Sequence, residues 1–160
     1  MGKGYSCISN VTAKSILSKF FGDSKRIPFS WVTLTIEDGL TTQIDARWSI
    51  TTEDVKDHRG ILQGVLVQEA ASQAVVCYAI ATKLFPDHSP MFLGSDHFRL
   101  HAPVRANDEL HIRVTDINWR GKKGSASAVA LVGDKRVATI STMYFRANSE
   151  EVLERIGTAA

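Results

Sequence analysis

A single carboxylate stands among apolar residues in the segment 64–83, which reads as a helix. Glu69 lies in the second turn, with Gln68, Ser72 and Gln73 beside it, because residues i and i+4 lie on one side of a helix. Burial among apolar groups disfavours the charged form of a carboxyl group. The types and spacing of these residues therefore indicate general acid or base chemistry at Glu69.

Two interpretations of this polar stripe stay open. In the first, residues 68, 69, 72 and 73 are the solvent-facing edge of an otherwise buried helix. In the second, they line a polar slot in apolar surroundings, where Glu69 reacts. Gly64 favours the second, because a glycine at the start of a helix permits close backbone approach. The free N–H groups of the first turn can then bind a carbonyl oxygen that gains negative charge.

A helix this apolar has to be enclosed by other elements. The strand-like runs that follow it are 91–104, 109–119, 125–133 and 136–146, separated by the short turns RANDE, RGKKG and VGDK. Short turns join antiparallel neighbours. Upstream, the segment 29–50 alternates around Asp38-Gly39, a strong hairpin signal. We therefore predict an α+β fold in which a curved antiparallel sheet wraps around one long apolar helix, the arrangement called the hot-dog fold.

Alternation along these strands predicts two faces. The residues expected to face one way are Phe98, Leu100, Leu110, Ile112 and Val114. Those expected to face the other way are His97, Arg99, His101, His111 and Arg113. We interpret the second set as a solvated outer face rather than as a site.

The 160 residues are enough for one domain with a hydrophobic core, so we expect a single domain over 1–160. Asn10 is expected to cap a short helix that ends at Gly22, within a helical lead-in over 1–26. The polar segment 51–60 reads as a loop, and residues 147–160 are expected to form a tail with a short helix.

The composition excludes several classes of function. The chain is 44% hydrophobic and 22% charged, with a net charge of +2 and no long basic run, so nucleic-acid binding is not expected. No two of the five histidines are paired at helical spacing on a predicted helix, so we expect no metal and no other cofactor. Cys7 and Cys77 lie far apart in the sequence, so we expect two unpaired reduced thiols. Reduced thiols are typical of cytoplasmic proteins. The longest apolar run falls short of the ~20 residues that span a bilayer, and no signal-peptide core is seen at the N-terminus.

Two sequence blocks resemble one enzyme family. The block "GVLVQEAASQA" is similar to the motif Pro-Gly-Val-Leu-x-x-Glu-Ala-x-Ala-Gln of the beta-hydroxyacyl-carrier-protein dehydratases, which are hot-dog enzymes of fatty-acid synthesis. The residues in register are Gly64, Val65, Leu66, Glu69, Ala70 and Gln73. The block "FLGSDHFRLHAPVRANDEL" resembles a second motif of that family, through Gly94, Asp96, Pro103, Val104, Asp108 and Leu110. The resemblance covers roughly residues 27 to 146.

This resemblance implies a homodimer, or a multiple of dimers, with sites between subunits. The implied substrate is an acyl thioester of carrier protein or coenzyme A, in fatty-acid or polyketide-type metabolism. His58 would remove the proton alpha to the carbonyl, and Glu69 would protonate the leaving 3-hydroxyl. The N–H groups near Gly64 and Val65 would hold the enolate oxygen, and the acyl chain would pass Phe98. The family's histidine precedes the glutamate by fourteen residues, whereas His58 precedes Glu69 by eleven.

A second resemblance lies in the same superfamily. The segment "DHRGILQG" is similar to the Asn-x-x-Gly-x-x-His-Gly-Gly segment of phenylacetate-type acyl-CoA thioesterases. This resemblance implies that Glu69 activates water or acts as a nucleophile, with Gln63 and Gly64 near the carbonyl. Gln73 is a further candidate for substrate binding. A catalytically silent acyl-binding protein is the third alternative, which the shortened histidine loop favours.

Overall fold

The computed structural model describes residues 7–12, 33–37, 43–86 and 88–149. In chain order, the elements in these ranges are β1 (Cys7–Thr12), β2 (Thr33–Glu37), β3 (Ile44–Ser49), α2 (Thr52–Val55), the 3-10 helix η1 (Lys56–His58), α3 (Gly64–Ala81), β4 (His88–Leu100), β5 (Glu109–Arg120), β6 (Lys123–Val132) and β7 (Lys135–Ser149). The strands form one antiparallel sheet in the order β1-β2-β3-β5-β6-β7-β4.

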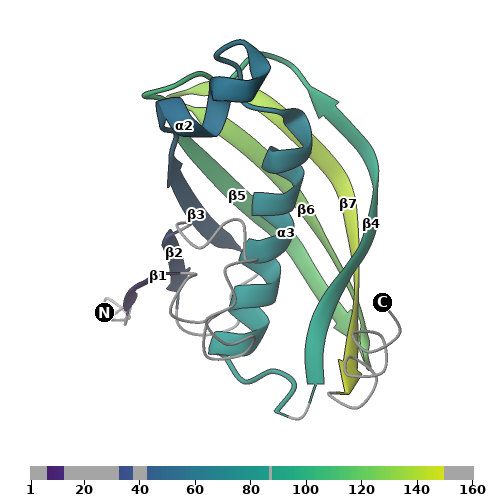
Figure 1. Ribbon diagram of the computed structural model, residues 1–160. Helices are drawn as coiled ribbons and strands as arrows, with labels where there is room; N and C mark the ends of the chain where they lie inside the picture. The colour runs from purple at the N-terminus through teal and green to yellow at the C-terminus, as the bar shows by residue number, and fades with distance from the viewer. Residues whose placement is uncertain (1–6, 13–32, 38–42, 87, 150–160) are drawn as a thin grey trace.

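The sheet curves around α3, which lies along its concave face (Figure 1). The helix contributes small or medium apolar side chains to the core, namely Val67, Ala70, Ala71, Ala74, Val75 and Cys77. Small side chains allow a helix and a sheet to approach closely, and a helix apolar on most sides gains from burial on most sides. The predicted arrangement, a curved antiparallel sheet around one long apolar helix, is confirmed.

The register of the strands follows from the burial of alternate residues. Leu110, Ile112 and Val114 on β5 are fully buried, whereas Arg113 between them is exposed. A slip of one residue would move every buried side chain of the strand to the outer face, so the core fixes the pairing. The predicted alternation is therefore confirmed on β5.

The hairpin upstream of α3 is also confirmed, since β2 and β3 pair antiparallel with Ile36 opposite Ile44. The Asp38-Gly39 turn itself lies outside the described residues. At the other end of the chain, residues 147–149 continue β7, and the rest of the expected tail helix lies outside the described residues.

Two expectations about local structure are wrong. Residues 10–12 belong to strand β1, so Asn10 does not begin a helix, because pairing with β2 overrides the local helix signal. Residues 13–26 lie outside the described residues.

The segment expected as a loop at 51–60 contains α2 and η1 instead. Thr51 and Asp54 start α2 with a capping box, in which each side chain accepts a hydrogen bond from the other residue's backbone N–H.

The short turn predicted between β4 and β5 does not join them as antiparallel neighbours. These strands follow each other along the chain, but β4 pairs with β7 at the edge of the sheet while β5 pairs with β3 and β6. The segment 101–108 crosses the end of the sheet instead of making a hairpin. Backbone bonds hold it there, from Leu62 N–H to Val104 O (2.8 Å) and from His101 N–H to Val137 O (2.8 Å).

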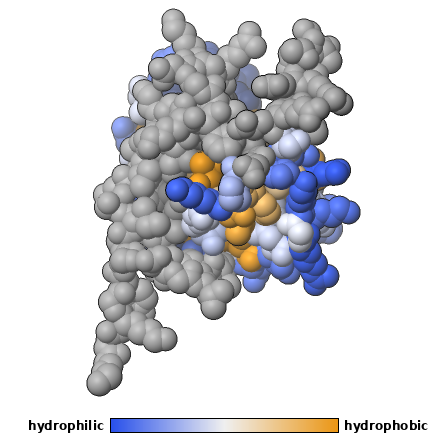
Figure 2. Space-filling model, turned by 90° about the horizontal axis from the view of Figure 1, so that it is seen from below, coloured by the Kyte–Doolittle hydropathy of each residue, from blue (hydrophilic) through white to orange (hydrophobic). Residues whose placement is uncertain are grey.

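The lower end of the molecule in Figure 1 is where α3 leads toward β4. Seen from below, hydrophobic residues are visible near the middle of this end, with hydrophilic residues mainly to their right (Figure 2). Leu84, which follows α3, is 41% exposed. Hydrophobic side chains therefore reach the surface at this end. None of the helices in the described part of the chain is long and apolar enough to cross a membrane.

A glycine on β6 gives a test of this packing. A Cβ added at Gly124 would lie 2.5 Å from the ring of Trp119. That ring cannot move freely, because it packs edge-on against Phe85 and tilted against Phe145. We expect Gly124→Ala to lower the free energy of unfolding by about 1–3 kcal/mol, the usual effect of overpacking, as measured by urea denaturation.

The matched control is Gly94→Ala on the edge strand β4, where an added Cβ meets no heavy atom within 4 Å. This substitution is expected to change the unfolding free energy much less. Equal effects of the two substitutions would contradict the packing described for Trp119.

Candidate functional site

The polar stripe on α3 is not a solvent-facing edge. Ser72 is 2% exposed and Gln73 is 8% exposed, while Gln68 and Glu69 are half-buried. The stripe therefore passes from the boundary of the core into the core. The burial of Ser72 and Gln73 argues against a fully solvent-facing edge, and the reactivity of Glu69 stays a prediction.

Glu69 is held by its neighbours on the same helix. Gln73 Nε2 donates a hydrogen bond to Glu69 Oε1 (3.1 Å), and Ser72 Oγ donates to the backbone carbonyl of Glu69 (2.8 Å). Within the described residues, the other carboxylate oxygen of Glu69 makes no hydrogen bond. One carboxylate oxygen of Glu69 is thus held by the Gln73 amide, and the other oxygen is free to bind a ligand.

Gln73 carries a further mark of a polar site. Its Oε1 atom is buried and has no hydrogen-bond partner in the described part of the structure. A buried amide oxygen without a partner costs roughly 1–3 kcal/mol, so such atoms are uncommon in folded proteins. The buried part of the stripe thus contains one hydrogen-bond acceptor without a partner among the described residues.

The first turn of α3 leaves backbone donors free of the helix. Gln63, the residue before the helix, is extended and provides no side-chain cap. The N–H groups of Gly64 and Val65 therefore have no acceptor within the helix, as at any helix N-terminus. Gln63 and Val65 are both exposed, so this end of the helix is accessible. A carbonyl oxygen can bind there, favoured by the positive end of the helix dipole.

Strand β4 packs against this first turn. A Cβ added at Gly64 would lie too close to Cδ1 of Leu100, so an alanine at this position would require the Leu100 side chain to move. Phe98, two residues earlier, is half-buried and packs against the core. Leu100 is 49% exposed, so it forms the rim of the site rather than part of the core. Both side chains lie on the predicted face.

His58 stands apart from these groups. It ends η1 and is exposed, and its side chain forms no hydrogen bond or ion pair within the described residues. The chain then turns into the helix through two residues in the left-handed region, Arg59 (φ 55°) and Gly60 (φ 75°). The structure of one chain thus joins Glu69 to Gln73 by a hydrogen bond but does not join His58 to Glu69.

Sequence reasoning missed a charged network on the outer face of the sheet. Asp45 accepts hydrogen bonds from Gln43 (3.0 Å) and Arg113 (3.3 Å), and His111 Nε2 lies 2.7 Å from its carboxylate. Burial raises the pKa of Asp45, but these hydrogen bonds outweigh it, and the pKa is below its ordinary value of 3.8. The network joins β3 to β5 on the side away from α3. It depends on strand register, which no local sequence signal gives.

Two further kinds of chemistry find no support. The thiol of Cys77 is fully buried in α3, and burial raises its pKa to about 12, so it is not a nucleophile at neutral pH. Among the residues that the structure describes, no group of three or more His, Cys, Asp or Glu side chains is placed to hold a metal ion.

Comparison with known sequences gives one consistent likeness. Over 87 residues the chain is 30% identical to the 3-hydroxyacyl-[acyl-carrier-protein] dehydratase FabZ of Clostridium tetani. That match covers 54% of this chain and 61% of the relative, so the chain spans less than two thirds of the curated relatives it matches. No protein-family model matches the chain.

Comparison with solved structures identifies the fold. The hot-dog-like protein from Thermanaerovibrio acidaminovorans aligns with a TM-score of 0.62 at 19% identity, covering 74% of this chain and 89% of that one. The fluoroacetyl-CoA thioesterase FlK aligns with a TM-score of 0.63 at 11% identity, covering 76% and 98%. The chain therefore has the hot-dog fold, as predicted.

The contact between Gly64 and Leu100 can be tested by a double-mutant cycle. Gly64→Ala adds a methyl group that Leu100 must move to accommodate, and Leu100→Ala removes the obstacle. We expect the two substitutions to be non-additive by roughly 0.5 kcal/mol or more, with the alanine at 64 better tolerated when Leu100 is absent. Urea unfolding of the wild type and three variants measures this coupling, and simple additivity would contradict the contact.

Proposed function

We propose that this chain acts on acyl thioesters, and that its reaction is the dehydration of a 3-hydroxyacyl thioester to the enoyl thioester. The observation that carries the proposal is the half-buried carboxyl group of Glu69, held at one oxygen by Gln73 a little more than one turn after the start of an enclosed helix. The likeness to FabZ, a dehydratase of carrier-protein thioesters, supports this reaction over others.

In the proposed reaction, each group has a role. A base removes the proton alpha to the thioester carbonyl, and the carbonyl oxygen gains negative charge. The N–H groups of Gly64 and Val65 stabilise that oxygen. Glu69 gives a proton from its second carboxyl oxygen to the 3-hydroxyl, which leaves as water. The proton and the hydroxyl that leave the substrate balance the double bond formed between its carbons 2 and 3.

The base in this proposal is His58 of a second copy of the chain. Within one copy, His58 is exposed and makes no hydrogen bond to Glu69. Strand β4 forms an edge of the described sheet and packs against the first turn of α3. An unpaired edge strand is a ready surface for another strand. A homodimer formed along β4 would place groups of the second copy near the start of α3. Coenzyme A or a carrier protein supplies the thioester.

Hydrolysis of an acyl thioester is the second candidate. The structural likeness to FlK, a fluoroacetyl-CoA thioesterase, favours it, together with the exposed position of His58. In that reaction Glu69 would activate water or attack the carbonyl, and Gln63 beside Gly64 would contact the thioester oxygen. A chain that binds acyl thioesters without turnover is the third candidate.

The first test offers the protein a 3-hydroxyacyl thioester and a saturated acyl thioester, and measures enoyl product and free thiol separately. We expect enoyl product from the first substrate and little thiol from either. Glu69→Gln should lower the rate by about two to four orders of magnitude, the range of general acid catalysis, because the nearly isosteric amide cannot donate the same proton. Thiol release without enoyl product would instead establish the thioesterase.

The matched control is Glu109→Gln, which makes the same change at an exposed carboxylate of β5 on the outer face of the sheet. Its activity should stay near the wild-type level, and both variants should keep the wild-type circular dichroism spectrum. Near-wild-type turnover by the Glu69 variant would remove Glu69 from the site, and no turnover by the wild type on either substrate would favour the binding protein.

Substitution of His58 distinguishes dehydration from hydrolysis. If His58 is the base of the dehydratase, His58→Ala should lower enoyl formation by about two to four orders of magnitude. In a thioesterase the same change should be mild, and Gln63→Ala should be the more harmful. Lys56→Ala, also exposed on η1, is the control and should leave the rate unchanged. A mild effect of His58→Ala on enoyl formation would contradict its role as base.

A further inference from the structure

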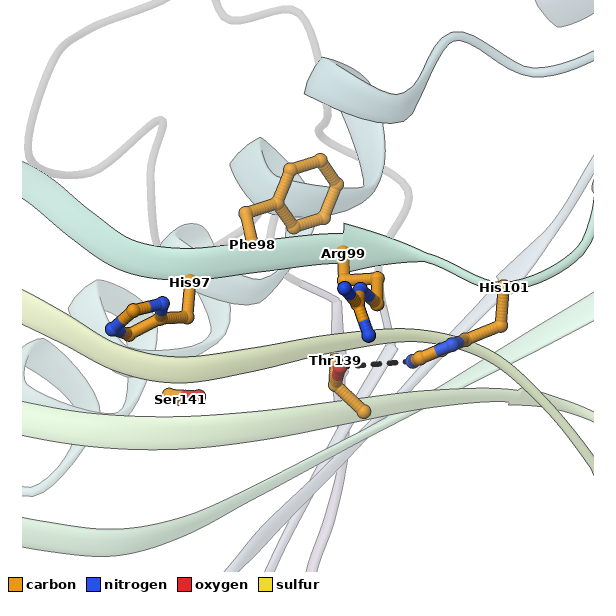
Figure 3. Close-up of a pocket in the computed structure, with 6 residues that line it drawn as sticks. All are labelled: His97, Phe98, Arg99, His101, Thr139 and Ser141. Atoms are coloured by element: carbon orange, nitrogen blue, oxygen red, sulfur yellow. Dashed lines mark hydrogen bonds between the residues drawn. The ribbon is translucent and has the colours of Figure 1, made fainter.

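A hollow lies on the outer face of the sheet, where β4 runs beside β7. Its volume is about 410 Å³, and the residues that line it are His97, Phe98, Arg99, His101, Thr139 and Ser141. Figure 3 shows Phe98 on one side of β4 and the other β4 side chains on the opposite side. The hollow is therefore separated from α3 and from the candidate site by the sheet itself.

Polar side chains converge in this hollow from two strands. Residues i and i+2 of a strand share a face, so His97 and Arg99 project together from β4. His101, which directly follows β4, lies on the same side (Figure 3). Figure 3 shows Arg99 between the two imidazole rings, with Thr139 and Ser141 on the neighbouring strand. His101 Nε2 and Thr139 Oγ1 are 2.9 Å apart and share a hydrogen bond. Five polar groups thus surround one space.

The positive charge in this hollow has no counter-ion in the described part of the chain. No carboxylate lines the hollow, and Arg99 forms no ion pair with a described residue. The nearby carboxylate on the same strand, Asp96, instead accepts a hydrogen bond from Tyr144 Oη (2.7 Å). Elsewhere on the outer face, by contrast, Arg47 is paired with Glu109. The guanidinium of Arg99 is therefore available to an anion.

We propose that this hollow binds a phosphate group. A guanidinium offers donors in a planar fork that matches two phosphate oxygens. Two imidazoles and two hydroxyls can serve the remaining oxygens, whereas a carboxylate has only two oxygens to offer five groups. The exposed positions of His97, Arg99 and His101 agree with the expected outer face, but the shared hollow makes them a binding site rather than scattered solvated charges.

The test is a titration of the full chain with inorganic phosphate, at constant pH and ionic strength, followed by NMR of the histidine side chains. We expect the imidazole signals of His97 and His101 to shift saturably, with Kd of about 1 mM, the scale of a weak specific site. Arg99→Gln should weaken binding at least about tenfold, because the charged bidentate donor is lost. His101→Gln is a second variant that should also weaken it.

The matched control is Arg146→Gln, which removes an exposed arginine of β7 that does not line the hollow and should leave the affinity unchanged. Equal affinities of the Arg99 and Arg146 variants, or shifts that do not saturate, would overturn the proposal. Variants are compared only when their backbone spectra match the wild type.

Two further probes distinguish the source of the phosphate. Coenzyme A and 3′-dephospho-coenzyme A are titrated in the same way. If the phosphate belongs to a thioester carrier, coenzyme A should shift the two histidine signals at lower concentration than its dephospho form. If the two act alike and more weakly than inorganic phosphate, the hollow binds free phosphate. Both results support the site, and neither depends on the reaction proposed for Glu69.

Discussion

Enclosure of α3 is the constraint on which the rest of the structure depends. The helix is apolar on most sides, so its burial requires a surface that reaches around it, and the antiparallel sheet supplies one by curving. The alanines on its buried side keep the helix close to the sheet. A polar stripe in such a helix has to be satisfied inside the protein, and here Gln73 and Ser72 bond to Glu69.

Strand β4 contributes side chains to both faces of the sheet, and those on the inner face contact α3. On the inner face Leu100 closes over Gly64 and Phe98 packs against the core, which places β4 beside the free N–H groups of the helix. On the outer face the intervening Arg99 is exposed. The alternation of a single strand therefore places an apolar rim on one side of the sheet and a cationic hollow on the other. Because β4 is an edge strand, a second copy of the chain can reach both.

The sequence predicts those features that depend on local periodicity. Apolar spacing and turn residues predict the start of α3, the alternation on β5 and the pairing of β2 with β3, and the structure confirms all three. The helix ends at Ala81, two residues before the predicted end. The helix expected at Asn10 fails because a distant partner, β2, decides the conformation of β1. The pairing of β4 with β7 is equally non-local, so neither the hollow beside Arg99 nor the contact of Leu100 with Gly64 was predictable. The candidate site was predictable only in part. Glu69 and Gln73 lie on one helix, so their spacing shows that they are neighbours, whereas His58 lies outside that helix.

The central claim is that the acyl thioester binds at the start of α3, near Glu69 in the second turn of this helix. The most direct measurement is a ¹H–¹⁵N NMR titration with a non-hydrolysable thioether analogue of an acyl-coenzyme A, which binds without reacting. The account predicts that the amide signals of Gly64 and Val65 move most among those of the described residues, because their N–H groups bind the carbonyl oxygen, and that the Gln73 side-chain amide moves with them. Saturable shifts that leave the first two turns of α3 untouched would contradict it.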